Sequence, residues 1–459
     1  MKRNLKFIFI FSILVLFYSE IILAQKKDKR NLPGQLTNKK PSDSTLKSDK
    51  LNHIIKTDTI PIPLTDSNSV IKTTDAMVQT PPVVDSALLD RITELEQQVS
   101  EQKSGDDHFM VVGLATLGFI SSKGTNTLNG ASSVIKTNSF PDAGRFEFSP
   151  LFLWRHGKKF LMEFEPSFNN GGLSVNWADI SYFATPGLII RAGYLVLPFG
   201  YYNKHLAAGW IGKLASDPIG IGTPASDYGI EVEGGLPLGN MKWNYDFAIT
   251  NGLQLLNDGQ IQNAGITDNN KNKTLSGRLG ILPFSNSSLE LGFSSLYGKI
   301  GDAVTKFKNA STTMYAFDIN FVKAVNPIMI NFKAQYNLIN INRQNFVNPN
   351  DSTQNYSFDN KTNSSYTQLS LRPSFSKNEI LKNFELAFRY ANYTTPENSL
   401  FGNKSNQFNA GICYWVNWRS VLKLTHETLS ETSTINKVVG TDTGKTVTNS
   451  WILQFSIQL

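Results

Sequence analysis

The 459-residue sequence contains one cysteine, Cys413, which excludes a disulfide framework and any metal site built from several cysteines. Beyond residue 23, no uninterrupted apolar run approaches the ~20 residues of a membrane-spanning helix, so a polytopic helical membrane protein is excluded. Charged residues make up 18% of the chain, below the average of about 25% for soluble domains. The net charge of +7 is spread over 44 basic and 37 acidic residues, too dilute to indicate nucleic-acid binding.

Enzymatic motifs are also lacking. The five histidines are scattered without metal-ligand spacing: His53, His108, His156, His205 and His426. Neither a Gly-x-Ser-x-Gly motif nor a phosphate-binding P-loop is present. His205, Ser216 and Asp217 share one segment, but nothing in the sequence fixes their geometry. We therefore predict no enzymatic activity, no cofactor and no metal. What is abundant is aromatic residues (30 Phe, 15 Tyr and 7 Trp), typical of a β-barrel membrane protein.

The N-terminus has the pattern of a secretory signal peptide over residues 1–24. Basic residues precede an apolar stretch from Phe7 to Phe17, and Ala24 supplies a small residue at the cleavage point. The alternative is an uncleaved anchor helix. Residues 25–83 are polar and lack periodicity, which predicts a disordered periplasmic segment.

A short helical pattern follows over residues 84–104. Leu88, Ile92, Leu95 and Val99 are spaced by four, three and four residues, as on a heptad seam. The segment is either a coiled coil that trimerises the protein below the membrane or a short amphipathic helix that caps the barrel.

From residue 107 to residue 459 the apolar residues recur with a period of two. In 382–393, for example, Phe384, Leu386 and Phe388 alternate with Glu385 and Arg389, so one face suits lipid and the other water. Sixteen segments follow this pattern: 109–120, 143–155, 159–168, 172–185, 187–197, 227–237, 241–252, 273–284, 288–299, 311–324, 327–342, 363–376, 382–393, 404–416, 418–430 and 446–459.

The connections between these segments alternate in length. Those after even-numbered segments are mostly short, such as Leu238-Gly239-Asn240, and those after odd-numbered segments are mostly long, such as 121–142 and 198–226. Outer-membrane barrels distinguish their periplasmic and external rims in this way. The fold class expected is all-β, a 16-stranded antiparallel transmembrane β-barrel over residues 107–459. Its last strand, which ends at Leu459, resembles the C-terminal insertion signal of outer-membrane proteins.

Residues 143–252 resemble the phosphate-selective porin O and P family of Gram-negative outer-membrane porins. The resemblance rests mainly on Arg191-Ala-Gly-Tyr-Leu-Val-Leu-Pro-Phe-Gly200, together with Arg145-Phe-Glu-Phe-Ser-Pro150 and Asp227-Tyr-Gly-Ile-Glu-Val-Glu-Gly234. It implies a water-filled, often trimeric pore that passes small solutes by diffusion. Residues 107–459 carry 29 basic and 24 acidic residues, a surplus that supports at most a weak anion preference.

The function expected is thus a porin in the cell outer membrane, a homotrimer through which small hydrophilic solutes or inorganic ions diffuse passively.

 The alternative is a plugged barrel with a role in surface binding, adhesion or catalysis at its rim. Connection 198–226 is the candidate constriction, with residues Lys204, His205, Trp210, Lys213 and Asp217. Candidates for the lumen wall are Arg145, Glu147, Glu163, Glu165, Arg191, Lys333, Arg389, Arg419 and Lys423.

Overall fold

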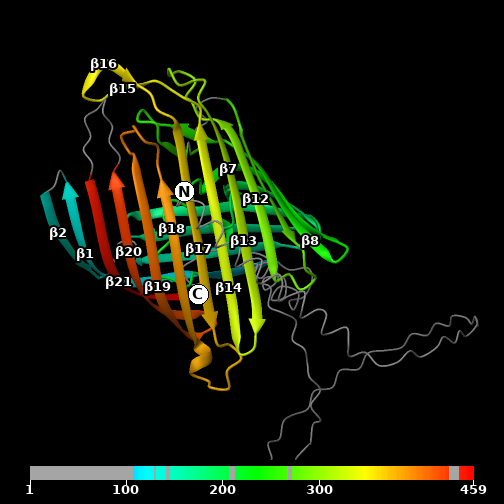
Figure 1. Ribbon diagram of the computed structural model, residues 1–459. Helices are drawn as coiled ribbons and strands as arrows, with labels where there is room; N and C mark the ends of the chain where they lie inside the picture. Colours follow the sequence, from blue (N-terminus) through cyan, green and yellow to red (C-terminus); the bar gives the residue numbers. More distant parts are fainter. Residues whose placement is uncertain are drawn as a thin grey trace, which may run out of the picture. The chain divides into compact units, whose positions relative to one another are not determined.

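The computed structural model describes residues 107–128, 131–140, 145–205, 212–263, 265–266, 271–433 and 444–459. The signal peptide, the disordered segment and the helix expected over residues 1–104 lie outside this range. Within it, sixteen antiparallel strands form a closed barrel, which confirms the predicted fold class (Figure 1). The strands are β1 (His108–Leu128), β3 (Glu147–His156), β4 (Phe160–Asn169), β5 (Gly172–Thr185), β6 (Leu188–Val196), β7 (Ser226–Leu238), β8 (Met241–Thr250), β11 (Thr274–Leu282), β12 (Leu289–Lys299), β13 (Ser311–Val325), β14 (Ile328–Ile341), β17 (Asn360–Arg372), β18 (Phe384–Thr394), β19 (Asn403–Asn417), β20 (Ser420–Ser433) and β21 (Gly444–Gln458).

The barrel closes where the first strand pairs with the last. β1 and β21 are paired from Leu114 opposite Gln458 to Leu128 opposite Gly444. Hydroxyl groups also bridge this seam, with Thr116 donating to Ser456 over 3.2 Å. Each of the sixteen strands therefore has a partner on both sides, and the ring has no open edge.

Each predicted segment corresponds to one barrel strand, but two details of the prediction were wrong. Residues 121–142 were expected to form a loop, whereas β1 continues to Leu128 and β2 (Ala131–Ser139) pairs back onto it. The polar strand β2 still forms a hairpin with β1, because the hydrogen bonds between the two strands come from the backbone. Arg419 was expected within a strand, and it lies instead in the turn between β19 and β20.

Most long connections lie at one end of the barrel and most short ones at the other. The exceptions are the short turn between β4 and β5 and the longer connection 373–383 between β17 and β18. At the long-loop end, two connections form small hairpins, β9 (Leu253–Leu255) with β10 (Ile261–Asn263) and β15 (Phe346–Asn348) with β16 (Asp351–Tyr356). Figure 1 shows β15 and β16 beyond this end. The helices α3 (Tyr202–His205) and η2 (Leu381–Asn383), like every helix in the described ranges, are too short to cross a membrane.

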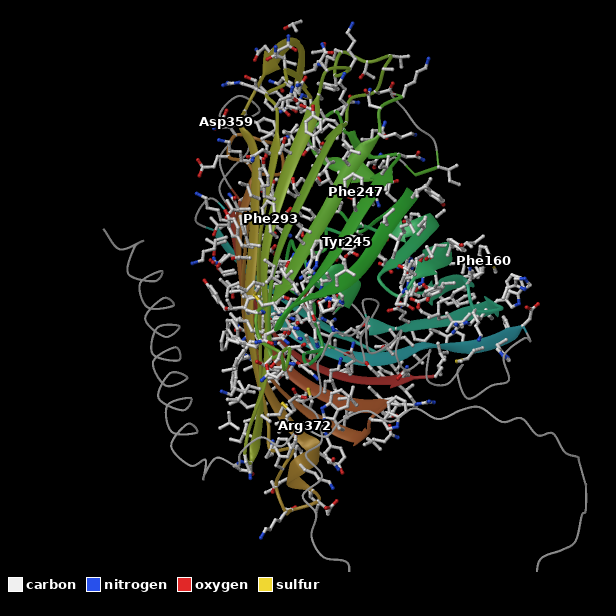
Figure 2. All side chains as sticks on the ribbon, turned by 90° about the vertical axis from the view of Figure 1, so that its right-hand side faces the viewer. Phe160, Tyr245, Phe247, Phe293, Asp359 and Arg372 are labelled. Atoms are coloured by element: carbon white, nitrogen blue, oxygen red, sulfur yellow. The ribbon has the colours of Figure 1, made fainter. Side chains whose placement is uncertain are left out.

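The two faces of the wall differ in chemistry. On β18, Leu386, Phe388 and Tyr390 point outward and are 42–45% exposed, whereas the inward Ala387 and Arg389 are buried. Figure 2 shows Tyr245, Phe247 and Phe293 on the outer surface in the same way. Large apolar side chains cover the outside of every barrel strand, and we call this surface the apolar belt. It is far larger than the apolar patches of a water-exposed protein surface.

An apolar cluster lies inside the barrel at its long-loop end. Inward side chains of β12, β13 and β14 pack there against residues of four long connections. Its buried members are Leu197, Phe199, Leu253, Leu255, Leu296, Ile300, Phe307, Ala310, Met314, Ala316, Ile339, Ile341, Phe346, Tyr356 and Phe358. The cluster joins the long connections to the wall of β12–β14.

Gly193 provides a test of the pairing between β5 and β6. Its φ angle is +145°, and an added Cβ would lie 2.2 Å from the carbonyl oxygen of Ala178. We expect Gly193→Ala to lower the free energy of unfolding by about 1–3 kcal/mol, because backbone strain and a collision with the neighbouring strand combine. Urea unfolding in detergent measures this loss. Gly239→Ala is the control, since Gly239 has a φ of +61° but no atom within 4 Å of the added Cβ. Equal losses in the two variants would contradict the pairing.

Candidate functional site: a loop inside the barrel

The connection between β6 and β7, residues 197–225, folds into the barrel, and we call it the lumen loop. Its residues 206–211 lie outside the described range. Its two ends are joined by a hydrogen bond of 2.9 Å from the backbone N–H of Leu197 to the carbonyl of Ala225. Between these ends the loop contacts inward side chains of ten consecutive strands, from β7 round to β20.

The loop enters the barrel through the turn Pro198-Phe199-Gly200. Gly200 has a φ of +72°, and an added Cβ would lie 2.1 Å from Nε2 of Gln335. The backbone N–H groups of Tyr201 and Tyr202 both donate to Oε1 of Gln335, over 2.8 and 2.9 Å. The N–H of Gly200 donates to Oγ of Ser294 over 3.0 Å. Glycine at this position thus lets the loop backbone reach the wall of β12 and β14.

Tyr201 is a packing centre for cationic side chains. Its ring lies 5.4 Å from the guanidinium carbon of Arg278 and 5.5 Å from Nζ of Lys333. The ring of His205 stacks on it with centroids 4.4 Å apart. Burial, together with the charges of Arg278, Lys204 and Lys333, holds the pKa of His205 well below its usual range. His205 is therefore a neutral ring packed against Tyr201.

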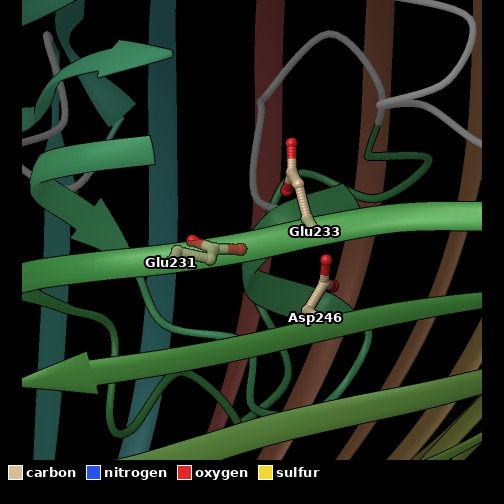
Figure 3. Close-up of side chains that lie close together, drawn as sticks. All are labelled: Glu231, Glu233 and Asp246. Carbon is tan, nitrogen blue, oxygen red and sulfur yellow. The ribbon is translucent and has the colours of Figure 1, made fainter. Parts of the chain in front are cut away.

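Lys204 in α3 is bound by three carboxylates that project from β7 and β8 (Figure 3). Its Nζ is paired with Glu231, lies 3.1 Å from Oε2 of Glu233 and lies 3.6 Å from Oδ2 of Asp246. Burial alone would lower the pKa of Lys204, but the charges of Asp246, Glu231 and Glu233 raise it well above its usual value.

This acidic trio also has the spacing of a metal site, since oxygen atoms of its three carboxylates lie within 4.8 Å of one another. The ammonium group of Lys204 sits among those oxygens, and only 3% of its side chain is exposed. The trio therefore binds a cation that the chain itself supplies. Its structural role is to hold α3 against the inner wall.

The segment from Lys213 to Ile219 is held on the opposite wall. Wall side chains recognise its backbone, with Arg389 donating to the carbonyl of Ser216 and Gln407 to that of Asp217. The Cys413 thiol donates to the carbonyl of Lys213, and the N–H of Ala215 donates to Oγ1 of Thr425 over 3.0 Å. Lys213 also lies 3.5 Å from Glu385. The loop thus crosses the interior from β7 to β20.

Two further ion networks line the wall. Arg278 lies 2.9 Å from Glu290 and 2.6 Å from Asp318, and all three side chains are nearly fully buried. Arg191 lies 2.9 Å from Glu163 and 2.7 Å from Asp179. Both networks neutralise charges that would otherwise be costly to bury.

The predicted site residues fall into three groups. Lys204, His205, Lys213 and Asp217 lie in the described part of the lumen loop, and Trp210 lies outside the described residues. Inward positions on or beside the strands hold Arg145, Glu147, Glu163, Glu165, Arg191, Lys333, Arg389 and Lys423. Arg419 lies at the short-turn rim over the ring of Trp418.

The sequence analysis missed Glu231, Asp246, Arg278 and Gln335, which bind the lumen loop. Glu231 and Glu233 are two residues apart on one strand, so their shared inward face was readable from the alternation. Their partner Lys204 is 27 residues away from Glu231, and no local pattern joins the two.

His205, Ser216 and Asp217 do not form a catalytic arrangement. The hydroxyl of Tyr202 donates to Asp217, and Nδ1 of His205 is buried with no hydrogen-bond partner among the described residues. Ser216 is bound by Arg389 and Asn409 on the wall. The three side chains are thus engaged separately, and none of them activates another.

Comparisons with known proteins find neither a matching family profile nor a matching characterised protein. The outer membrane channel DcaP of Acinetobacter baumannii is 12% identical, with 78% of this chain and 99% of that chain covered and a TM-score of 0.48. The anion-selective porin from Comamonas acidovorans is 12% identical, with 77% and 100% covered and a TM-score of 0.46. OmpF of Salmonella typhi is 11% identical, with 76% and 97% covered and a TM-score of 0.44. Because these sequence identities and TM-scores are low, none of the three structures identifies the function of this chain.

The binding of Lys204 to the acidic trio can be tested by removing its charge. We expect Lys204→Met to lower the free energy of unfolding by about 3–5 kcal/mol, because it leaves buried carboxylates without their partner. Urea unfolding of the purified barrel measures this loss, and Lys204→Arg should recover part of it. Lys404→Met is the control, since the pair of Lys404 with Glu397 is exposed and should contribute little. A Lys204→Met barrel as stable as the Lys404→Met barrel would contradict the role of Lys204 in holding α3 against the inner wall.

Proposed function

We propose that the protein is an outer-membrane porin that lets small hydrophilic solutes or ions diffuse through a water-filled channel. The observation that carries this proposal is the combination of a closed barrel, an apolar belt outside and a polar, charged wall inside. A soluble protein would have the opposite arrangement, with its apolar side chains in the interior.

The membrane assignment follows from the belt and the closure. In lipid, each backbone N–H and C=O group must be bonded within the protein, and a closed ring of strands achieves this. β-Barrels of this kind occur in outer membranes, and the signal peptide expected over residues 1–24 would direct the chain across the inner membrane. The short-turn end would then face the periplasm, together with the N-terminal segment.

The channel assignment follows from the number of strands. Barrels of sixteen strands are wide enough to leave an aqueous channel, whereas eight-stranded barrels are filled by side chains. The lumen loop narrows the interior from the side of β7–β20. A passage that is narrowed by a loop and lined by charges selects solutes by size and charge.

The weak anion preference suggested by the sequence is not supported by the lumen wall. Strands β3–β8 carry many inward acids and few inward bases. The acids are Glu147, Glu163, Glu165, Asp179, Asp227, Glu231, Glu233 and Asp246. Arg191 is the main basic residue among them, and a ladder of bases for phosphate is not formed on these strands.

The second candidate function is a plugged barrel that acts at the cell surface. The apolar cluster at the long-loop end favours it, because rigid loops packed by Phe346, Tyr356 and Phe358 could present a binding surface. Such a barrel would hold the lumen loop across the whole interior and carry no steady current. Conductance therefore separates the two functions.

A homotrimer is part of the proposal. Outward phenylalanines form a continuous strip over β1, β3 and β4, with Phe152 stacked 6.2 Å from Phe109 and 6.1 Å from Phe164. Phe148 and Phe168 extend the strip at 6.1 Å. Close-packed aromatic side chains of this kind suit a protein–protein contact within the membrane plane.

The channel is tested by single-channel recording of purified, heat-modifiable barrel in a planar bilayer. We expect stepwise conductance, because water fills the part of a sixteen-stranded lumen that the loop leaves free. An empty detergent preparation serves as the control. Folded protein that inserts and gives no steps would overturn the porin and favour the plugged barrel.

The trimer is tested by light scattering in detergent. We expect the wild type to be trimeric and the double variant Phe164→Ala with Phe168→Ala to shift towards monomer, because it removes part of the aromatic strip. Phe388→Ala with Phe408→Ala is the matched control, since these residues are exposed on β18 and β19, away from the strip. Equal behaviour of the two double variants would place the interface elsewhere.

A further inference from the structure

The described residues of the lumen loop, 197–205 and 212–225, contact mainly one part of the wall. Their contacts run over ten strands from β7 to β20, which we call the covered arc. The remaining strands are β21, β1, β3, β4, β5 and β6, which we call the facing arc. The loop reaches this arc at Arg145, which lies just before β3 and donates from Nε to the carbonyl of Ala215 over 2.7 Å.

Five charged side chains of the covered arc are withdrawn from water, whereas Asp246 of the acidic trio is 16% exposed. Arg278, Glu290, Asp318, Lys333 and Lys423 are each at most 3% exposed. They are bound to one another, to the wall or to the loop. Charges held in this way stabilise the structure and lie away from the path of a solute.

The facing arc keeps charged groups that water reaches. Glu147 on β3 is partly exposed, and its Oε1 accepts hydrogen bonds from Ser149 and Ser167 over 2.6 and 3.0 Å. The side chains of Glu163 and Arg191 are 13% and 12% exposed. Glu147 and Glu163 lie on β3 and β4, and the guanidinium of Arg191 lies 3.8 Å from Glu233 of the acidic trio.

We infer that solutes pass between the lumen loop and the facing arc, and that Glu147 makes this passage prefer cations. This inference rests on the proposed channel function and deepens it. Inward acids of the arc are Glu147, Glu163, Glu165 and Asp179, and inward bases are Arg145, Arg155 and Arg191. The carboxylates are in excess by one. Arg191 is already bound by Asp179 and Glu163, and Arg155 lies at the short-turn rim, where it donates to the carbonyl of Gly157. The local field in the passage is therefore negative despite the positive net charge of the chain.

Ion selectivity tests the preference. Reversal potentials are measured across a KCl gradient at or below about 0.1 M, where the screening length is still about 10 Å. Wild-type channels should favour K⁺. Glu147→Gln should lower the cation-to-anion permeability ratio by up to about tenfold, because one unit charge about 6 Å from an ion in water favours a cation about threefold and disfavours an anion about threefold. Glu397→Gln is the control, because Glu397 is an exposed acid outside the lumen. Anion-selective wild-type channels, or equal ratios in the two variants, would overturn the inference.

Thiol labelling tests the route independently of current. The native Cys413 is fully buried beneath Lys213, so the wild type provides an unreactive background. Glu147→Cys places a thiol on the facing arc, and Ala387→Cys places one on the covered arc, at a fully buried inward position. Charged methanethiosulfonates should label the Glu147→Cys barrel rapidly, as measured by intact mass, and leave the Ala387→Cys barrel unmodified. Similar rates at both positions would overturn the route.

The two readouts separate failure of this inference from failure of the proposed function. A barrel that carries no current but is still labelled selectively at Glu147→Cys contradicts the proposed porin function. It still supports an open space beside the facing arc. A barrel that conducts but is labelled equally at both positions supports the proposed porin function and contradicts the inferred route beside the facing arc. In a conducting Glu147→Cys barrel, a sulfonate-bearing reagent should restore the cation preference, because it returns the negative charge that Glu147 supplied.

Discussion

The closure of the backbone hydrogen-bond ring is the constraint on which the rest of this structure depends. The pairing of β1 with β21 gives every barrel strand two partners, so no strand edge is left open. Once the backbone is satisfied within the wall, the side chains alone decide which solvent each face meets. Side chains point alternately outward and inward along each strand, so apolar ones meet lipid and polar ones meet the lumen. A shift of one residue in register would turn Phe388 inward and Arg389 outward. The apolar belt and the charged lumen are thus two consequences of one closed ladder.

The charged lumen in turn makes the position of the loop possible. A loop that enters a barrel must satisfy its backbone groups, and polar wall residues such as Gln335, Gln407 and Thr425 bind them. It must also avoid leaving buried charge unpaired. Lys204 meets this requirement because it brings one ammonium group to three carboxylates of β7 and β8. The loop is thus complementary to the wall in charge at Lys204, beside β7 and β8, and in hydrogen bonding where it meets Gln407 and Thr425 on β19 and β20.

Much of this fold could be predicted because strand periodicity is a local signal. Phe384 to Phe388 reveal a two-sided strand within five residues, and the turn at Gly239 is equally local. The direction of the lumen loop could not be predicted, since Gly and Pro density marks turns but not the surface that they meet. Asp217 shows the limit: its partner is Tyr202 within the loop, whereas the sequence offered His205 and Ser216 just as readily. The β1–β2 hairpin was missed because its polar residues carry no apolar alternation, although its backbone pairs for nine residues.

The same reasoning explains why net charge is a poor guide to selectivity in a barrel of this kind. A lysine such as Lys333 or Lys423 adds to the total but is at most 2% exposed, and its field is offset by the groups packed around it. A carboxylate such as Glu147 adds one charge to the same total while remaining in contact with water. Only the second kind of group acts on a passing ion at short range, because water and salt screen the rest. In the proposed channel, the loop would therefore determine selectivity as much by the wall charges that it covers as by those that it leaves exposed.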